Sequence, residues 1–232
     1  MRIPSELEYC HERLGARFNT ALSNYDTQCR LDQLINRFLT DDMVVGKETL
    51  DVGCGLGFFS ERLVHRGARV TAFDLGPTLV ERASARASCR GVVGDALNLS
   101  KQFGPEGFDL VVSSECIEHT PSPTEALSQM CAVLKPGGWM AISTPNKIWQ
   151  PVVKAATLLH LRSFDGLENF STFGSIKKTL ESCGVNVVQE VGLHLWPFQL
   201  PLHPLSAWCD SHLQVARRAM INICVLGQKR IR

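Results

Sequence analysis

One ten-residue stretch restricts the fold of this chain more than any other. Residues 48–57 read ETLDVGCGLG, so a short apolar run enters a turn with glycine at Gly53, Gly55 and Gly57. The next segment, 58–66, has the pattern of a helix that stops at Gly67. Glycine permits a tight turn and leaves the backbone uncovered where a ligand must come close. This unit therefore predicts an α/β domain with a ligand at the end of its first strand.

The pattern that follows the glycine turn alternates regularly between apolar runs and helical segments. Strands are predicted at 68–74, 91–95, 108–115, 138–145 and 185–195, with a last strand within 216–230. Helices are predicted at 77–88, 122–134, 147–162 (broken near Pro151) and 175–184, and residues 5–40 have helical character. Continuously apolar strands joined by helices are typical of a buried parallel sheet. The expected fold is a doubly wound, seven-stranded α/β sheet, and 196–208 fits neither pattern.

Composition narrows the classes of protein that this fold can serve. The 232 residues suit one domain, which we expect to be soluble. The formal net charge is +1, from 24 basic and 23 acidic residues, and this disfavours nucleic acid as a partner. Nine cysteines occur at irregular spacing without a C-x-x-C pair, which argues against both a disulfide framework and a zinc site. Such thiols, with no apolar signal segment at the beginning, favour the cytoplasm.

A carboxylate follows the glycine turn at an informative distance. Asp74 ends the second predicted strand 21 residues after Gly53, the offset at which an acidic side chain reaches ribose hydroxyls. A dinucleotide fingerprint would place glycine three residues after Gly55, but Phe58 stands there and Gly57 comes one residue earlier. The spacing therefore favours a nucleoside ligand without a pyrophosphate.

The order of these motifs resembles that of the class I S-adenosylmethionine methyltransferases. The similarity runs from about residue 48 to 146 through LDVGCGLG, AFD, GDA, FDLVVSSECIEHT and LKPGGWMAISTPN. It implies a mostly parallel sheet whose seventh strand is antiparallel. It also implies these cofactor contacts: Asp51, Gly53, Gly55 and Gly57 around the methionine part, Asp74 at the ribose, Leu75, Asp95 and Ala96 at the adenine, and Ser114 at the amino-acid end.

A second cluster lies just beyond the predicted strand 108–115. If residues 115–119 (ECIEH) turn helically, Glu115, Glu118 and His119 share one face. Three interpretations stay open. The three side chains ligate a divalent cation, His119 with Glu118 acts as a general base, or the residues only fix the loop by hydrogen bonds.

The pattern E-x-x-E-H-x-x-x-P, followed by K-P-G-G and S-T-x-N, resembles the ubiquinone-pathway O-methyltransferases. This resemblance implies a magnesium ion at Glu115, Glu118 and His119. It also implies that Arg30, which stands 23 residues before Gly53, contacts the carboxylate of the cofactor. The W-x-x-x-G and H-x-x-N-P signals that precede this arginine in that group are absent here.

These observations define a domain organisation and a function to test. We expect one methyltransferase domain with a helical N-terminal lid (1–45), a cofactor-binding core (46–146), an acceptor-binding cap (147–215) and a final strand (216–232). Within the lid, Tyr25 and Asp26 are candidates to cover the cofactor. The basic amphipathic segment 147–162 covers the active site or contacts a membrane surface. The expected reaction is methyl transfer from S-adenosylmethionine to an oxygen, less favourably a nitrogen, of a small molecule. The alternatives are a non-catalytic cofactor-binding module, or an N- or C-methyltransferase of a natural product or lipid.

Overall fold

The computed structural model describes residues 4–10, 12, 24–159, 166–197 and 202–231. Seven strands form one sheet in the order β3-β2-β1-β4-β5-β7-β6. Their bounds are Glu48–Val52 (β1), Arg69–Asp74 (β2), Arg90–Val93 (β3), Phe108–Ser114 (β4), Leu134–Pro145 (β5), Val185–Leu193 (β6) and Asn222–Lys229 (β7). β1 to β5 pair in parallel, and β7 lies antiparallel between β5 and β6. The predicted doubly wound sheet with an antiparallel last strand is confirmed.

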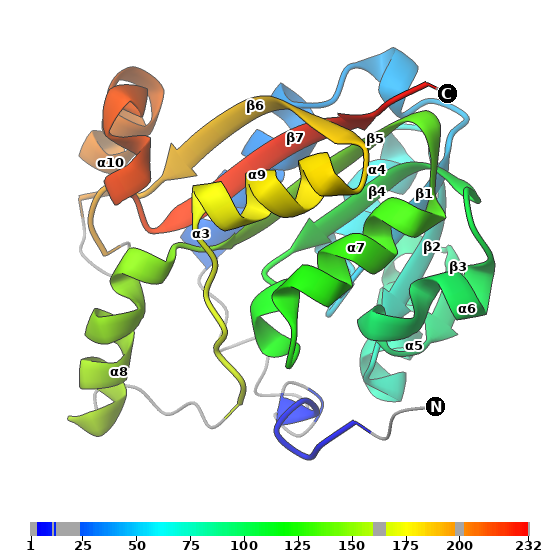
Figure 1. Ribbon diagram of the computed structural model, residues 1–232, viewed down its shortest axis with the longest axis horizontal. Coiled ribbons are helices and arrows are strands. Elements are labelled where there is room, and N and C mark those ends of the chain that lie inside the picture. Colours follow the sequence, from blue (N-terminus) through cyan, green and yellow to red (C-terminus); the bar gives the residue numbers. More distant parts are fainter. Residues whose placement is uncertain (1–3, 11, 13–23, 160–165, 198–201, 232) are drawn as a thin grey trace.

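Helices cover both faces of this sheet. The main ones are Asn24–Leu31 (α3), Phe58–His65 (α4), Pro77–Ala87 (α5), Leu99–Phe103 (α6), Pro123–Val133 (α7), Gln150–Leu158 (α8), Phe173–Ser182 (α9) and His203–His212 (α10). In Figure 1, α7 and α9 lie in front of the sheet and α4 lies behind it. The helix α8 projects from the lower left and α10 stands at the upper left. No helix in the described part of the chain is long and apolar enough to cross a membrane.

The core is divided by the sheet because successive residues of a strand face opposite sides. On β4, Val111 packs with the residues of α6, α7 and α9, whereas Leu110 and Val112 pack with those of α3 and α4. Apolar side chains at helical spacing from the end of α3 onward are buried on this second side, at Leu31, Leu34, Ile35, Phe38 and Leu39. None of the nine cysteines, all of which lie in described residues, forms a disulfide.

Three predicted segments differ from the structure. The helical region within 5–40 is no single helix where it is described: α3 continues into a π-helical turn, Asp32–Arg37. The segment 147–162 divides near Pro151 as predicted, but the part before it is a 3-10 turn, Lys147–Trp149. Pro151 itself stands in the first turn of α8, where its missing N–H is no loss. The unassigned stretch contains the start of α10, again with a proline in its first turn.

Candidate functional site

The glycine turn brings the ends of β1, β2 and β4 together. Gly53, Gly55 and Gly57 all have positive φ angles, of 75°, 50° and 82°. A Cβ atom on Gly53 would lie 2.5 Å from the side chain of Cys116, and one on Gly57 would lie 2.6 Å from the backbone of Ala83. Glycine is therefore required both for the conformation and for the close approach of the loop after β4 and of helix α5. The predicted loop is confirmed as the point where these elements meet.

Asp74, at the end of β2, is held by the backbone of this turn. The N–H of Gly55 donates to Oδ2 and the N–H of Gly76 donates to Oδ1, each over 3.0 Å. Burial raises the pKa of Asp74, although these backbone hydrogen bonds act in the opposite direction. Each carboxylate oxygen can accept a further hydrogen bond. The side chain is thus fixed where two hydroxyl groups of a ribose would find acceptors.

The other residues predicted around the cofactor surround the same turn. Asp51 at the end of β1 is buried and accepts a 2.6 Å hydrogen bond from Ser60, and burial raises its pKa to about 7. Asp95 follows β3 and caps the short turn Ala96–Asn98 by accepting from the N–H of Leu97. Leu75 directly follows Asp74 and is half-buried. The structure therefore assembles the predicted residues of β1, β2 and β3 at one edge of the sheet.

Arg30 reaches the carboxyl end of β4 from helix α3. Its Nη1 donates to Ser114 Oγ over 2.6 Å, and its Nε donates to Asp26 Oδ2 over 3.0 Å. Arg30 and Asp26 are each only 6% exposed. Burial alone would raise the pKa of Asp26, but Arg30 and His194 more than offset this and lower it. The predicted pair of Arg30 and Ser114 is therefore brought together, with an ionised Asp26 behind it.

Tyr25, the other lid candidate, points elsewhere. Its hydroxyl donates to the backbone oxygen of His203, and the two rings stack with centroids 3.9 Å apart. Tyr25 therefore packs against α10.

Glu115 begins the loop that follows β4 and has a positive φ of 52°. Its Oε1 accepts a hydrogen bond from Ser143 Oγ over 3.2 Å, and Ser143 Oγ lies 2.9 Å from Ser114 Oγ. Burial raises the pKa of Glu115 to about 8, with a further contribution from Glu118, while Arg30 acts against it. Glu115 thus belongs to the polar network of Arg30 and Ser114.

Glu118 and His119 lie in the 3-10 turn Ile117–His119 and form a separate pair. The carboxylate of Glu118 is 1% exposed and accepts a 3.0 Å hydrogen bond from Thr144. Burial raises its pKa to about 7. His119 Nδ1 lies 2.8 Å from the carbonyl oxygen of Leu167, and its Nε2 lies 3.7 Å from Glu118 Oε1. Because a carbonyl only accepts, Nδ1 carries the proton in this arrangement, and a neutral ring has its lone pair on Nε2.

The helical turn that would make a metal site of these residues is not formed. The positive φ of Glu115 reverses the chain before the 3-10 turn, so the i, i+3 and i+4 positions do not share one face. Glu115 bonds with Ser143, Glu118 with Thr144, and His119 with Leu167. Among the described residues, no group of three His, Cys, Asp or Glu side chains is placed to hold a metal ion. The helical turn on which the shared face depended is therefore absent, and the three side chains in this arrangement do not fit a three-ligand magnesium site.

Several residues of the site were not predicted to belong to it. Thr144 and Ser143 come from β5 and hold the two glutamates, and Leu167 orients His119. Asn169 donates to the backbone oxygen of Thr120 and steadies the same loop. Asn146 donates from its buried amide to the backbone oxygens of Arg218 and Met220. No short-range sequence signal marks such partners, because they lie 26 or more residues away.

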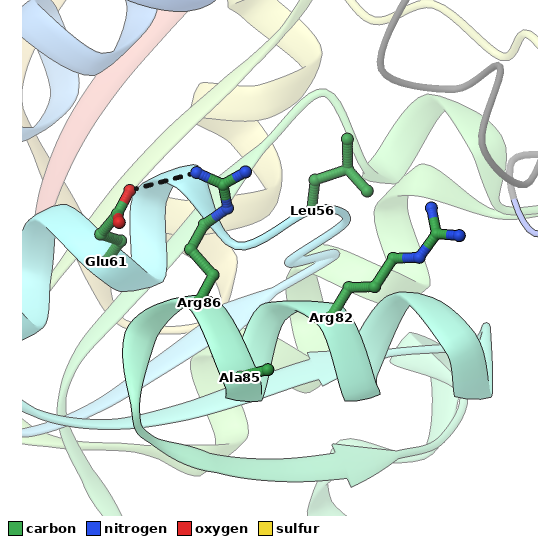
Figure 2. Close-up of a pocket in the computed structure, with 5 residues that line it drawn as sticks. All are labelled: Leu56, Glu61, Arg82, Ala85 and Arg86. Atoms are coloured by element: carbon green, nitrogen blue, oxygen red, sulfur yellow. Dashed lines mark hydrogen bonds and ion pairs between the residues drawn. The ribbon is translucent and has the colours of Figure 1, made fainter.

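A hollow of about 530 Å³ opens on another side of the glycine turn, between α4 and α5 (Figure 2). It is lined by Leu56, Glu61, Arg82, Ala85 and Arg86. Arg86 lies 3.4 Å from Glu61 and its guanidinium covers the ring of Phe58 at 4.3 Å. None of the candidate residues described above lines this hollow, so it is separate from the carboxylate cluster.

The sheet order, the glycine turn, the fixed carboxylate at the end of β2 and the polar end of β4 together define the class of enzyme, an S-adenosylmethionine-dependent methyltransferase. Comparison with known proteins agrees. A model of the methyltransferase domain family matches residues 23–190, so the chain belongs to that family.

The chain is similar to several curated proteins, two of which are named as O-methyltransferases. The biotin biosynthesis bifunctional protein BioHC of Teredinibacter turnerae is 31% identical over 202 residues, 76% of this chain and 34% of that protein. The ubiquinone biosynthesis O-methyltransferase of Xanthomonas euvesicatoria is 40% identical over 108 residues, 45% of each chain. That of Coxiella burnetii is 29% identical over 169 residues, 66% of this chain and 70% of that one. The chain thus spans about a third of BioHC and under half of the Xanthomonas enzyme.

Solved structures share the fold at low sequence identity. An S-adenosylmethionine-dependent methyltransferase from Mesorhizobium loti superposes with a TM-score of 0.66 at 19% identity, covering 89% of this chain and all of the other. Another, from Thermotoga maritima, gives a TM-score of 0.69 at 16% identity, covering 96% of this chain and 99% of that one.

Proposed function

We propose that this enzyme methylates a hydroxyl oxygen of a small molecule, with His119 as the general base and Glu118 as its support. The observation that carries the proposal is the geometry of His119. Its Nδ1 is held by the carbonyl of Leu167 and its Nε2 faces the buried carboxylate of Glu118. Two relatives named as O-methyltransferases support oxygen as the acceptor atom.

The described residues fit S-adenosylmethionine. A glycine cradle at Gly53 and Gly55, the fixed carboxylate of Asp74 and the guanidinium of Arg30 suit its backbone approach, its ribose and its carboxylate. When bound, the cofactor supplies a methyl group whose bond to sulfur breaks, leaving the electron pair on sulfur, as the bond to the acceptor oxygen forms.

The protein's part in the reaction is to place the acceptor and take its proton. His119 Nε2 accepts the hydroxyl proton, and an ionised Glu118 at 3.7 Å stabilises the imidazolium that results. The pKa of Glu118, raised to about 7 by burial, allows it to carry this charge near neutrality. The positive charge of the buried Arg30 lowers the pKa of Glu115 and of Glu118, and so favours the ionised form of both carboxylates.

Turnover with labelled S-adenosylmethionine tests the proposal directly. The acceptor panel contains phenols and catechols, carboxylic acids, and amines, each with and without a strong chelator. Methylation of a hydroxyl compound that survives chelation supports the proposal. Exclusive methylation of amines or carbons would overturn the choice of oxygen. Cofactor binding without turnover on any acceptor would favour a non-catalytic module.

Magnesium assistance is the competing mechanism at the same residues, and the chelator arm separates the two. If a metal orients the acceptor, chelation stops turnover and added magnesium restores it. Replacing Glu115 should then reduce the rate about as much as replacing His119. If His119 acts as a base alone, chelation has no effect and Glu115→Gln reduces the rate less than His119→Ala.

We also propose that α8 and the turn before it bind an anionic lipid surface. No residue of α8 is buried, and Leu158 and Leu159 are 79% and 67% exposed. Lys147 and Lys154 add positive charge, and 147–159 contains no acidic residue. Apolar side chains with lysines beside them suit an anionic bilayer interface. The remainder of the predicted segment, 160–162, lies outside the described residues.

Vesicle flotation tests this surface. Binding to phosphatidylglycerol vesicles should exceed binding to phosphatidylcholine vesicles and should fall with Leu158→Asp or Lys154→Glu. The control is Val188→Asp, which alters an apolar side chain of β6 that is also half exposed. Equal loss in the control, or no binding by the unmodified protein, would contradict the proposal.

A further inference from the structure

His194 is a buried histidine that no part of the proposed mechanism uses. It directly follows β6, is 0% exposed and has a positive φ of 61°. Its backbone is fixed on both sides: the N–H donates to Asp210 Oδ1 over 2.8 Å, and the carbonyl accepts from Ile221 over 2.9 Å. A histidine in this conformation is uncommon, and here the surrounding chain enforces it.

The ring of His194 connects helix α10 to helix α3. Nε2 lies 3.1 Å from Asp26 Oδ1, while Nδ1 lies 3.5 Å from Ser206 Oγ and 3.7 Å from Asp210 Oδ2. An ionised carboxylate only accepts hydrogen bonds, so Nε2 carries a proton and donates it to Asp26. Asp26 is thereby bonded through one oxygen to His194 and through the other to Arg30.

The contacts continue to the end of β4. Arg30 donates hydrogen bonds to both Asp26 and Ser114, and Ser114 is linked through Ser143 to Glu115. A long arginine side chain has many rotamers, and a carboxylate fixed from behind reduces them before a ligand arrives. His194 supplies that fixing contact from 168 positions along the chain.

We propose that His194 is a positioning residue that acts through Asp26 to aim Arg30 at the carboxylate of S-adenosylmethionine. The inference rests on the proposed role of Arg30 and deepens it. A positioning role can be told from a packing role, because only ligands with the amino-acid end depend on Arg30 for their binding. A residue that merely holds α3 against α10 would affect every ligand of the site alike.

The experiment compares two ligands by calorimetry. S-adenosylhomocysteine has the amino-acid end, whereas 5′-methylthioadenosine has the adenosine and sulfur without it. His194→Asn suits the left-handed backbone and keeps a polar group near Nδ1, but it is too short to reach Asp26. His194→Gln extends an amide donor to the place of Nε2 and is the conservative variant. Arg30→Ala tests the role of Arg30 itself.

We expect His194→Asn to weaken the binding of S-adenosylhomocysteine about 10-fold and to leave the binding of methylthioadenosine unchanged. His194→Gln should bind both ligands as the unmodified protein does. Equal loss for both ligands, or no loss for either, would overturn the inference. If His194→Asn does not fold, Asp26→Asn is measured with the same two ligands and the same expectation. If Arg30→Ala selectively weakens the binding of S-adenosylhomocysteine and His194→Asn does not, the inference about His194 fails and the role of Arg30 stands. If Arg30→Ala leaves the affinity for S-adenosylhomocysteine unchanged, the proposed role of Arg30 fails, and the inference about His194 fails with it.

Discussion

The two sides of the cofactor site are stabilised in different ways. Around the glycine turn, the carboxylates of Asp74 and Asp95 are held by backbone N–H groups. Gly76 and Leu97 donate from two residues away, and Gly55 donates to Asp74 from the turn itself, 19 residues away. At the end of β4, side chains hold one another over long separations, 84 residues for Arg30 and Ser114 and 48 residues for His119 and Leu167.

Under the proposed function, this difference separates the residues that would recognise adenosine from those that would hold the amino-acid end of the cofactor and take the proton of the acceptor. A backbone donor is fixed once the strand and turn have formed, so the adenosine side needs only the local fold. A network of side chains depends on several distant elements and tunes charge, as the raised pKa values of Glu115 and Glu118, about 8 and about 7, indicate. Substitutions on the first side should reduce binding of every adenosine ligand. On the second side, substitutions at Glu118 and His119 should reduce the rate, whereas those at Arg30 should reduce binding of ligands that carry the amino-acid end.

The largest effect is expected from His119→Ala. Removing a general base should lower the methyl-transfer rate by about 10²–10⁴-fold. The affinity for S-adenosylhomocysteine should stay the same, because the partners described for His119, Leu167 and Glu118, lie outside the glycine turn. Single-turnover kinetics and calorimetry on the same variant measure the two quantities. A rate that is unchanged would remove His119 from catalysis, and a parallel loss of affinity would break the proposed division between the two sides.

Gly57→Ala should cause the largest loss of stability on the adenosine side. A methyl group at position 57 would lie 2.6 Å from the backbone of Ala83, and the residue would also have to adopt a φ of 82°. Conformational strain and overpacking together should cost about 2–5 kcal/mol in the free energy of unfolding. The matched control is Gly184→Ala, just after α9, where φ is 78° but nothing lies within 4 Å of the added atom. It should cost only about 1–2 kcal/mol, so equal losses in urea melts would show that close approach is unimportant.

Stability should also fall as the pH rises past the usual range of a glutamate, because Glu118 is buried. In the folded protein, burial raises the pKa of Glu118 from its ordinary value of 4.5 to about 7. The unfolded chain therefore releases this proton first, and folding loses stability between about pH 4.5 and pH 7. The loss is on the order of 3 kcal/mol over this window. Glu118→Gln should remove that part of the slope in melts taken across the window, and an unchanged slope would show that the carboxylate is not the cause.

What the sequence could predict follows the same division. The strands, the glycine turn and Asp74 were predictable because their signals are periodic or lie within about twenty residues. The relation of Glu115 to His119 was not, because a positive φ at a glutamate has no local signature. The partner of Asp26 was equally hidden, since His194 stands 168 residues away and no periodic pattern joins them.

The smallest of these effects, and the sharpest test of the comparison, is expected at Asp74. Asp74→Ala removes a fixed acceptor for the ribose and should weaken S-adenosylhomocysteine by about 1.5–3 kcal/mol, as for hydrogen bonds to a charged group. Methylthioadenosine contains the same ribose, so calorimetry should show the same loss for it, in contrast to Arg30→Ala. Asp74→Asn keeps one acceptor for the N–H of Gly55 or Gly76 and controls for disturbance of the turn. If the alanine variant spares methylthioadenosine but not S-adenosylhomocysteine, Asp74 does not hold the ribose, and the two sides of the site do not divide the cofactor between them.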